Sequence, residues 1–201
     1  MSEDNFVKIL SLFLLAGAAV SAAPITTTQV TLVNTGSPQV NDGSYYVGPY
    51  TLLINGQNYA AMCVDFLNHS NAGDSWTATL SQVGGDISST YHPIADVQYK
   101  EEAYLYGLIT QPGADRVDIQ HAAWNITDPG YATDSASQAY VTLAQNNYAG
   151  MNVSGFEVVS SASAPDKQEF MVDTPEPASL TLLGAGLLLT GILRRRKLAR
   201  A

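Results

Sequence analysis

Two apolar segments, one near each end of the chain, confine any globular fold to the residues between them. The first runs from Ile9 to Val20, follows Lys8 and ends in the small residues Val20-Ser21-Ala22-Ala23, a pattern that signal peptidase cleaves. It is shorter than the roughly 20 apolar residues of a membrane-spanning helix. We therefore predict that residues 1–22 are a signal peptide that is removed during export.

The second apolar segment, Ala178 to Leu193, lies between a Pro-Glu-Pro triplet and a basic cluster that includes Arg194-Arg195-Arg196-Lys197. An apolar run of this length that ends in a basic cluster is typical of a short transmembrane helix whose charged end stays in the cytoplasm. The residues before it are therefore expected to lie outside the cytoplasm.

This tail resembles the PEP-CTERM sorting signal, which consists of a Pro-Glu-Pro triplet, a short transmembrane helix and a terminal arginine cluster. The matching residues are Pro175, Glu176 and Pro177 for the triplet, and Arg194, Arg195 and Arg196 for the cluster. The resemblance implies that residues 174–201 hold the protein transiently in the inner membrane until an exosortase removes them. The released protein would belong to the cell surface or biofilm matrix of a polysaccharide-secreting bacterium. An ordinary single-pass anchor is the alternative.

The body between the two ends, residues 23–173, is acidic and contains a single cysteine, Cys63. It holds fifteen acidic and three basic residues, an excess of twelve negative charges. Such a domain repels nucleic acid and anionic lipid, so we expect no nucleic-acid partner. About 150 residues suffice for one domain with its own core. Exported domains usually carry cysteines in disulfide-bonded pairs, so the lone thiol requires another explanation.

The first half of the body has the residue pattern of strands. Strands are predicted at 27–33, 45–54, 57–67 and 76–83. Asn55-Gly56 separates two of these runs, which predicts a tight hairpin. A period of two places Cys63 late on its strand, on the face of Ala61, with Met62 and Val64 on the other face.

The second half has helical spacing followed by a return to strands. Val97, Leu105 and Leu108 suit one side of a first helix at 94–109, with Glu101 and Glu102 on the rest of its surface. Two further helices are predicted at 115–127 and 135–146, with aspartates at their starts, and strands at 155–160 and 168–172. The predicted fold is α+β: a β-sandwich or barrel-like sheet with a two- to three-helix insertion.

Two short segments resemble the signatures of bacterial thioester domains, in which a strand cysteine is bonded to the glutamine of a Gln-x-Ala-x-Trp helix motif. They are Ala61-Met62-Cys63-Val64-Asp65 and Ile119-Gln120-His121-Ala122-Ala123-Trp124, and the cysteine and the glutamine lie 57 positions apart. The resemblance implies a thioester between Cys63 and Gln120, in a pocket formed with Asp65, Ala122 and Trp124. Ile119 departs from the family, where threonine frequently precedes the glutamine.

A thioester between these residues requires a particular geometry and environment. The Cys63 sulfur must attack the carboxamide carbon of Gln120 and expel ammonia, which requires the two groups to be held in contact. The product acylates amines or hydroxyls but also reacts with water, so it needs a partly dry pocket. Trp124, one helical turn after Gln120, suits the wall of that pocket. Such a protein reacts once and is not an enzyme, and its partners would be surface amines or extracellular polysaccharide.

Two other interpretations of Cys63 remain open. In the first, Cys63 is a small buried apolar residue in a non-covalent structural component of the extracellular polysaccharide layer. In the second, Cys63 is a hydrolase nucleophile, although no local motif fixes the geometry of the groups that would assist it. The candidate bases are His69, His92 and His121, and the candidate orienting residues are Asp65 and Asp74. We predict neither a metal nor a cofactor, since no calcium-loop motif is present.

Overall fold

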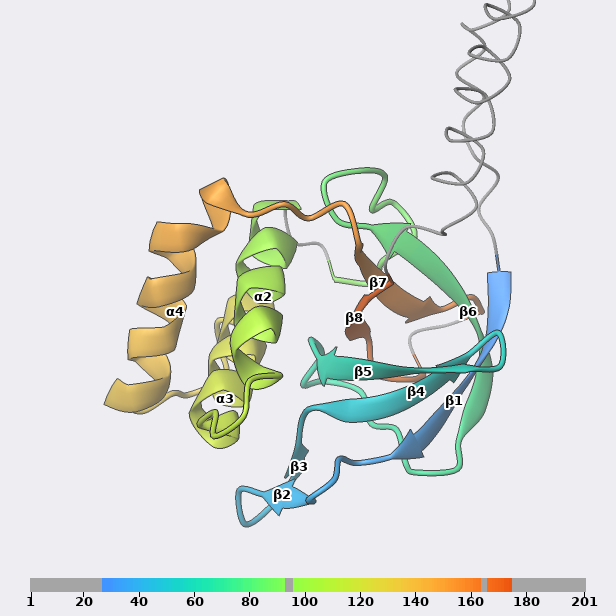
Figure 1. Ribbon diagram of the computed structural model, residues 1–201, viewed down its shortest axis with the longest axis horizontal. Coiled ribbons are helices and arrows are strands. Elements are labelled where there is room, and N and C mark those ends of the chain that lie inside the picture. The colour runs from blue at the N-terminus through green and yellow to red at the C-terminus, as the bar shows by residue number, and fades with distance from the viewer. Residues whose placement is uncertain (1–26, 93–95, 164–165, 175–201) are drawn as a thin grey trace, which may run out of the picture.

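The computed structural model describes residues 27–92, 96–163 and 166–174, in which a closed antiparallel barrel is flanked on one side by three helices (Figure 1). Around the barrel the strands follow the order β1, β4, β5, β8, β7, β6. They are β1 (Thr27–Asn34), β4 (Tyr50–Ile54), β5 (Gln57–Cys63), β6 (Ser75–Gln82), β7 (Phe156–Ser161) and β8 (Phe170–Asp173). Of the two predicted sheet arrangements, the structure has the barrel.

The predictions for the chain ends lie outside the described residues, since the signal peptide covers 1–22 and the sorting helix 178–193. Within the ranges that the structure covers, no helix combines the length and the apolarity that crossing a bilayer requires.

The predicted hairpin is the connection between β4 and β5. Ile54 pairs with Gln57, and Asn55 and Gly56 have φ angles of 50° and 78°. Two positive φ angles in a two-residue connection match the right-handed twist of the paired strands. The run before this turn is shorter than predicted, because Pro49 has no N–H to give to a strand ladder. It divides into β4 and β3 (Tyr46–Val47), and β3 pairs with the unpredicted β2 (Val40–Asn41).

The three predicted helices are present as α2 (Asp96–Ile109), α3 (Arg116–Thr127) and α4 (Ser135–Asn147), with a 3₁₀ turn at Tyr148–Gly150. Asp134 starts α4 by accepting hydrogen bonds from the N–H groups of Ala136 and Ser137. Asp115 accepts more weakly, at 3.5 Å, from the N–H of Asp118 at the start of α3. Aspartate is favoured at both positions because it satisfies free N–H groups at the positive end of the helix dipole.

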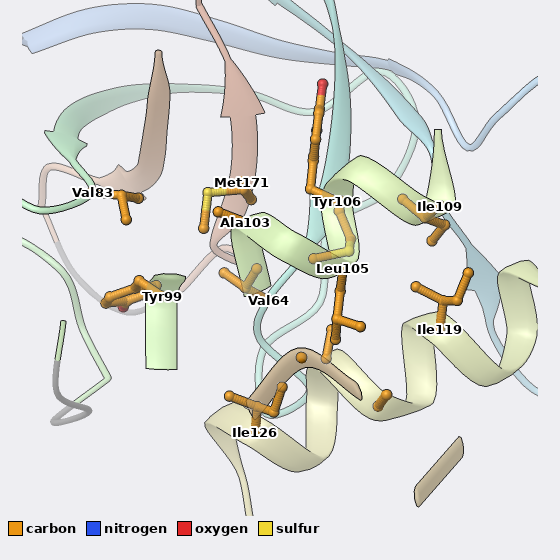
Figure 2. Packing of buried hydrophobic residues seen from close by; sticks show 14 of the residues in the cluster. Val64, Val83, Tyr99, Ala103, Leu105, Tyr106, Ile109, Ile119, Ile126 and Met171 are labelled. Atoms are coloured by element: carbon orange, nitrogen blue, oxygen red, sulfur yellow. The ribbon is translucent and has the colours of Figure 1, made fainter. Parts of the chain in front are cut away.

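The last three residues of β5 are buried, and their side chains alternate between two apolar clusters. Ala61 and Cys63 belong to the cluster inside the barrel, together with Leu52 and Phe170. Met62 belongs to the second cluster, which fills the space between the barrel and the helices. Figure 2 shows this second cluster, with Val64 and Met171 from the barrel side and Leu105, Ile119 and Ile126 from the helices. The predicted alternation along β5 is therefore confirmed.

One detail of the helix prediction is wrong. Glu102 has no exposed surface and Glu101 is also buried, whereas Val97 is 41% exposed. The reason is that α2 packs against the barrel strands β5 and β8 and also against α3 and α4. A helix that is covered from several sides has no single apolar stripe, so its spacing does not show which polar residues are buried.

Candidate functional site

Cys63 is the last residue of β5, and its side chain is fully buried inside the barrel. Its thiol donates a hydrogen bond to the backbone carbonyl of Asp65, with 3.0 Å between sulfur and oxygen. The indole N–H of Trp124 donates to the same sulfur, at 3.4 Å from Nε1 to Sγ. The strand and the helix predicted to face each other therefore meet at this sulfur.

Gln120 reaches the same place from α3 and is also fully buried. Its Nε2 donates to the backbone carbonyl oxygen of Cys63 at 2.6 Å. Its Oε1 accepts from the backbone N–H of Gly48 at 3.2 Å. The carboxamide is thus held at both of its polar atoms, and Cys63 and Gln120 are neighbours in space although 57 positions separate them in the chain.

Gly48 is a site residue that sequence reasoning missed. A Cβ atom at this position would lie 3.2 Å from Gln120 Oε1, and 3.4 Å from both Ala61 O and Ile109 Cδ1. Only a glycine lets the backbone come this close to the carboxamide without displacing it. No local pattern signals this need, because it arises from the packing of α3 against the barrel.

An aromatic cluster covers Trp124, which is itself only 2% exposed. Phe66 lies at 5.2 Å from the Trp124 ring, Tyr131 at 5.4 Å and Tyr45 at 6.1 Å, measured between ring centroids. His121 stacks on Trp124 at 5.5 Å. His121 belongs to α3, whereas Tyr45, Phe66 and Tyr131 lie in loops, where no periodic pattern marks them. Together these side chains cover Trp124.

Asp65 is buried beside the thiol, and its carboxylate organises the turn that follows β5. Oδ1 accepts from the backbone N–H groups of Leu67 and Asn68, and Oδ2 accepts from the Asn68 side chain at 2.7 Å. These bonds fix the position of the Asp65 carbonyl that receives the thiol hydrogen bond. Ala122, the fifth residue of the predicted pocket, is buried in the other cluster, between the barrel and the helices.

Burial raises the pKa of Cys63 to about 12, and the charges of Asp65 and Glu102 act in the same direction. The hydrogen bonds from Trp124 and to Asp65 counter only part of this rise in the pKa. The thiol is therefore neutral at neutral pH. A cysteine hydrolase needs a thiolate and a lowered pKa, so the environment of Cys63 does not favour that chemistry.

The hydrolase interpretation also requires a histidine at the thiol. His69 stacks on Tyr45, and His121 Nε2 lies 2.9 Å from Asp42 Oδ2. His92 lies 3.3 Å from Asp65 and 3.5 Å from Glu169, on the carboxylate side of Asp65. Asp74 is engaged by Lys167 at 2.7 Å. No hydrogen bond or ion pair of the three histidines reaches Cys63 within the described residues.

A cavity of about 260 Å³ lies against the outer side of Trp124. Aromatic side chains and neutral polar groups line it, and His69 is the one titratable residue among them apart from tyrosines. The lining consists of Thr35, Ser44, Tyr45, Tyr46, Tyr50, Phe66, His69, Ser70, Asn71, Trp124 and Gln168. No cluster of three or more histidine, cysteine or acidic side chains suited to a metal ion occurs in the described part of the chain.

Comparison with known proteins identifies the C-terminal tail. Residues 173–197 match the PEP-CTERM protein-sorting motif, which confirms the predicted tail and implies export and processing by an exosortase. No curated protein matches the chain in sequence. Among solved structures, the N-terminal thioester domain of a surface protein from Clostridium perfringens is similar, with a TM-score of 0.43 and 12% identity. That similarity covers 73% of this chain and 98% of the solved domain.

Proposed function

We propose that this exported protein forms an internal thioester between Cys63 and Gln120 and uses it once, to attach itself covalently to an amine or hydroxyl of a partner. The observation that carries the proposal is the buried hydrogen bond from the Gln120 carboxamide to the backbone carbonyl of Cys63. It brings the carboxamide to the backbone of Cys63, the one cysteine in the sequence. Such a fixed geometry lowers the entropic part of the barrier to reaction.

Formation of the bond needs no cofactor or further reagent. The Cys63 sulfur attacks the Gln120 carbonyl carbon, the C–N bond breaks, and the amide nitrogen leaves as ammonia with the proton that the thiol loses. Negative charge develops on Oε1 during the attack, where the backbone N–H of Gly48 already donates a hydrogen bond. A donor fixed in this position stabilises the tetrahedral intermediate as an oxyanion hole does.

The surroundings of Cys63 suit an acyl group that must survive in water. The sulfur is fully buried, and an aromatic cluster covers Trp124 on its outer side. A thiol whose pKa is raised to about 12 is also a poor leaving group, which slows attack by water and by a partner alike. When a partner does attack, the Trp124 N–H lies 3.4 Å from the sulfur and can stabilise its developing charge.

A non-covalent structural role is the second candidate. The Cys63 thiol and the Gln120 carboxamide already have hydrogen-bond partners as free groups, so burial alone would account for both. In that case the protein would be a passive component of an extracellular polysaccharide layer.

Intact mass spectrometry of the protein purified after export separates the two candidates. A thioester leaves the chain lighter by one ammonia, and methylamine should add one molecule while releasing one thiol that labels under denaturing conditions. Cys63→Ala and Gln120→Ala should each remove both signals. Gln138→Ala, a substitution on the far helix α4, is the matched control and should retain them. A wild-type chain of full mass that forms no adduct with methylamine would exclude the thioester. Turnover of an ester substrate would point to a hydrolase.

A further inference from the structure

We propose that the cavity beside Trp124 is the acceptor subsite of the thioester, and that it takes a neutral saccharide whose hydroxyl attacks the acyl group. This inference rests on the proposed function. It narrows the partner from any amine or hydroxyl to one chemical class.

Two side chains that line the cavity also belong to the surroundings of the sulfur. Trp124 lines the cavity, while its indole nitrogen lies 3.4 Å from Cys63 Sγ. Tyr50 also lines the cavity and belongs to the barrel cluster that contains Cys63. A molecule in the cavity is therefore separated from the reactive pair by one layer of aromatic rings. The movement of Tyr45, which is 40% exposed and packs edge-on against Trp124, would open that layer.

The size and lining of the cavity fit a sugar ring. Its volume of about 260 Å³ is close to the lower end of small-molecule sites, which begin at about 300 Å³. Sugars combine apolar C–H faces with a rim of hydroxyls. Tyr45, Tyr46 and Phe66 supply aromatic rings for the former, and Ser44 and Asn71 supply polar side chains for the latter.

The cavity lining offers no oppositely charged partner to the other acceptors. No aspartate, glutamate, lysine or arginine lines the cavity. Among the acids on the neighbouring segments, Asp42 is paired with His121 and Asp74 with Lys167. Asp65 and Glu169 are fully buried. A cationic amine would thus find aromatic rings in the cavity but no carboxylate to pair with. An anionic saccharide would find no lysine or arginine in the lining, and the twelve excess negative charges of the body would repel it.

The transfer step balances without a further reagent. The saccharide hydroxyl oxygen attacks the Gln120 carbonyl carbon, the C–S bond breaks, and an ester forms between the sugar oxygen and the Gln120 acyl group. The hydroxyl proton ends on the Cys63 sulfur, which becomes a thiol again. The Gly48 N–H stabilises the carbonyl oxygen in this step as in the first.

The test compares three acceptors on the exported protein by intact mass: a pool of maltotriose, cellotriose and mannotriose, the cationic amine spermidine, and methylamine. We expect an ester adduct with the saccharide pool whose rate saturates with concentration, as binding before reaction requires. Asn71→Ala and Tyr46→Ala should each raise the half-saturating saccharide concentration about fivefold, the equivalent of one lost hydrogen bond or ring contact of about 1 kcal/mol. Tyr148→Ala, a tyrosine outside the cavity, is the matched control and should leave that concentration unchanged.

The outcomes separate the two proposals. If methylamine adds but the saccharide pool does not, the thioester stands and the saccharide subsite is wrong. Saturable reaction with spermidine alone would assign the cavity to a cationic amine and likewise overturn the inference. If neither methylamine nor the saccharides add, the proposed function itself fails. A saccharide rate that responds to Tyr148→Ala as strongly as to Asn71→Ala would also contradict the subsite.

Discussion

The side chain of Gln120 binds the backbone of Cys63, and not its sulfur, through a hydrogen bond of 2.6 Å from Nε2 to the carbonyl oxygen. Helix α3 is therefore docked on the end of β5 through an atom that every residue type possesses. This bond does not depend on the thiol, so replacing the thiol should leave it in place. Substitutions that move the carboxamide should change the chemistry more than those that alter nearby packing.

Gly48→Ala should displace the Gln120 carboxamide while both reacting residues remain unsubstituted. The added Cβ would lie 3.2 Å from Gln120 Oε1 and 3.4 Å from the Ala61 carbonyl oxygen. We expect the thioester fraction, measured as the methylamine-reactive fraction by mass spectrometry, to fall at least severalfold. The free energy of unfolding should fall by about 1–3 kcal/mol, the usual cost of overpacking.

Gly107→Ala is the matched control for that substitution. Gly107 lies inside α2, and a Cβ there would meet nothing within 4 Å. Alanine in a helix interior should stabilise the protein by up to about 1 kcal/mol and leave the reactive fraction unchanged. An unchanged reactive fraction in Gly48→Ala would contradict the role given to the Gly48 contact.

The two tryptophans of the chain offer a paired comparison. The Trp124 N–H donates to the Cys63 sulfur, whereas the buried Trp76 N–H has no hydrogen-bond partner among the described residues. Trp124→Phe should slow the reaction with methylamine severalfold, because the leaving sulfur loses its donor. Trp76→Phe removes an unpaired polar atom, so it should cost less stability than Trp124→Phe, with no effect on the rate. Equal rates in the two variants would show that the indole N–H does not assist the sulfur.

Glu102 should make the protein less stable as the pH rises. It is fully buried, neither carboxylate oxygen has a hydrogen-bond partner among the described residues, and burial raises its pKa well above the ordinary value. The charges of Glu169, Glu101 and Asp65 add to the rise. The folded state therefore holds this proton more tightly than the unfolded state does. Between the ordinary and the raised pKa, the free energy of unfolding must fall with increasing pH.

Glu102→Gln removes this titration with little change in shape. In urea unfolding, the variant should gain stability relative to the wild type between about pH 5 and about pH 8. Parallel stability profiles for the two proteins over this range would mean that Glu102 does not hold its proton in the folded state.

Asp42 fastens the β2–β3 hairpin to α3 and so helps to hold Tyr45 over Trp124. Burial pushes the Asp42 pKa upward, but hydrogen bonds from Tyr45, His121 and Ser44 outweigh it and leave the pKa below its ordinary value. Its contribution to stability is thus present above the ordinary pKa of the carboxyl and is lost as the pH falls through the lowered one. Asp42→Asn weakens the hydrogen bonds that hold this hairpin. We therefore expect a loosened hairpin and hydrolysis of the thioester about two- to threefold faster at neutral pH, the equivalent of weakening one hydrogen bond by about 0.5 kcal/mol.

Asp86→Asn serves as the control for Asp42→Asn. Asp86 accepts a comparable turn hydrogen bond from the Ser88 N–H, in a loop that contributes nothing to the cavity. Thioester lifetime, followed as the loss of methylamine reactivity with time, should match that of the wild type. Equal thioester lifetimes in the wild type, Asp42→Asn and Asp86→Asn would show that Asp42 does not hold the β2–β3 hairpin over the site.

The sequence predicted those parts of the fold that short stretches of chain determine. Asn55-Gly56 forces a two-residue turn by its own backbone preferences, and Asp134 caps the helix that follows it, wherever these segments sit in the molecule. The two-residue strand β2 is too short to show a period, so it was not predicted, and β3 was predicted only as part of one longer strand with β4. The burial of Glu102 depends on layers that pack on α2 from several sides, which its own spacing cannot reveal.

In the candidate site too, residues in short motifs were predicted, and residues that act through the packing of distant segments were not. Cys63, Gln120 and Trp124 were found because each belongs to a short motif on one element. Gly48 and Tyr45 act only through the approach of distant segments, 72 positions apart for Gly48 and Gln120. A glycine that follows a short strand and a tyrosine in a polar loop carry no local signal of that approach.

The closed barrel limits the ways in which this protein can bind other molecules. Each of its six strands has a neighbour on both sides, so the barrel offers no free edge to which a foreign chain could add as another strand. On a crowded cell exterior this guards against unintended self-association. Recognition on the barrel therefore depends on side chains, and the proposed thioester would make an attachment permanent.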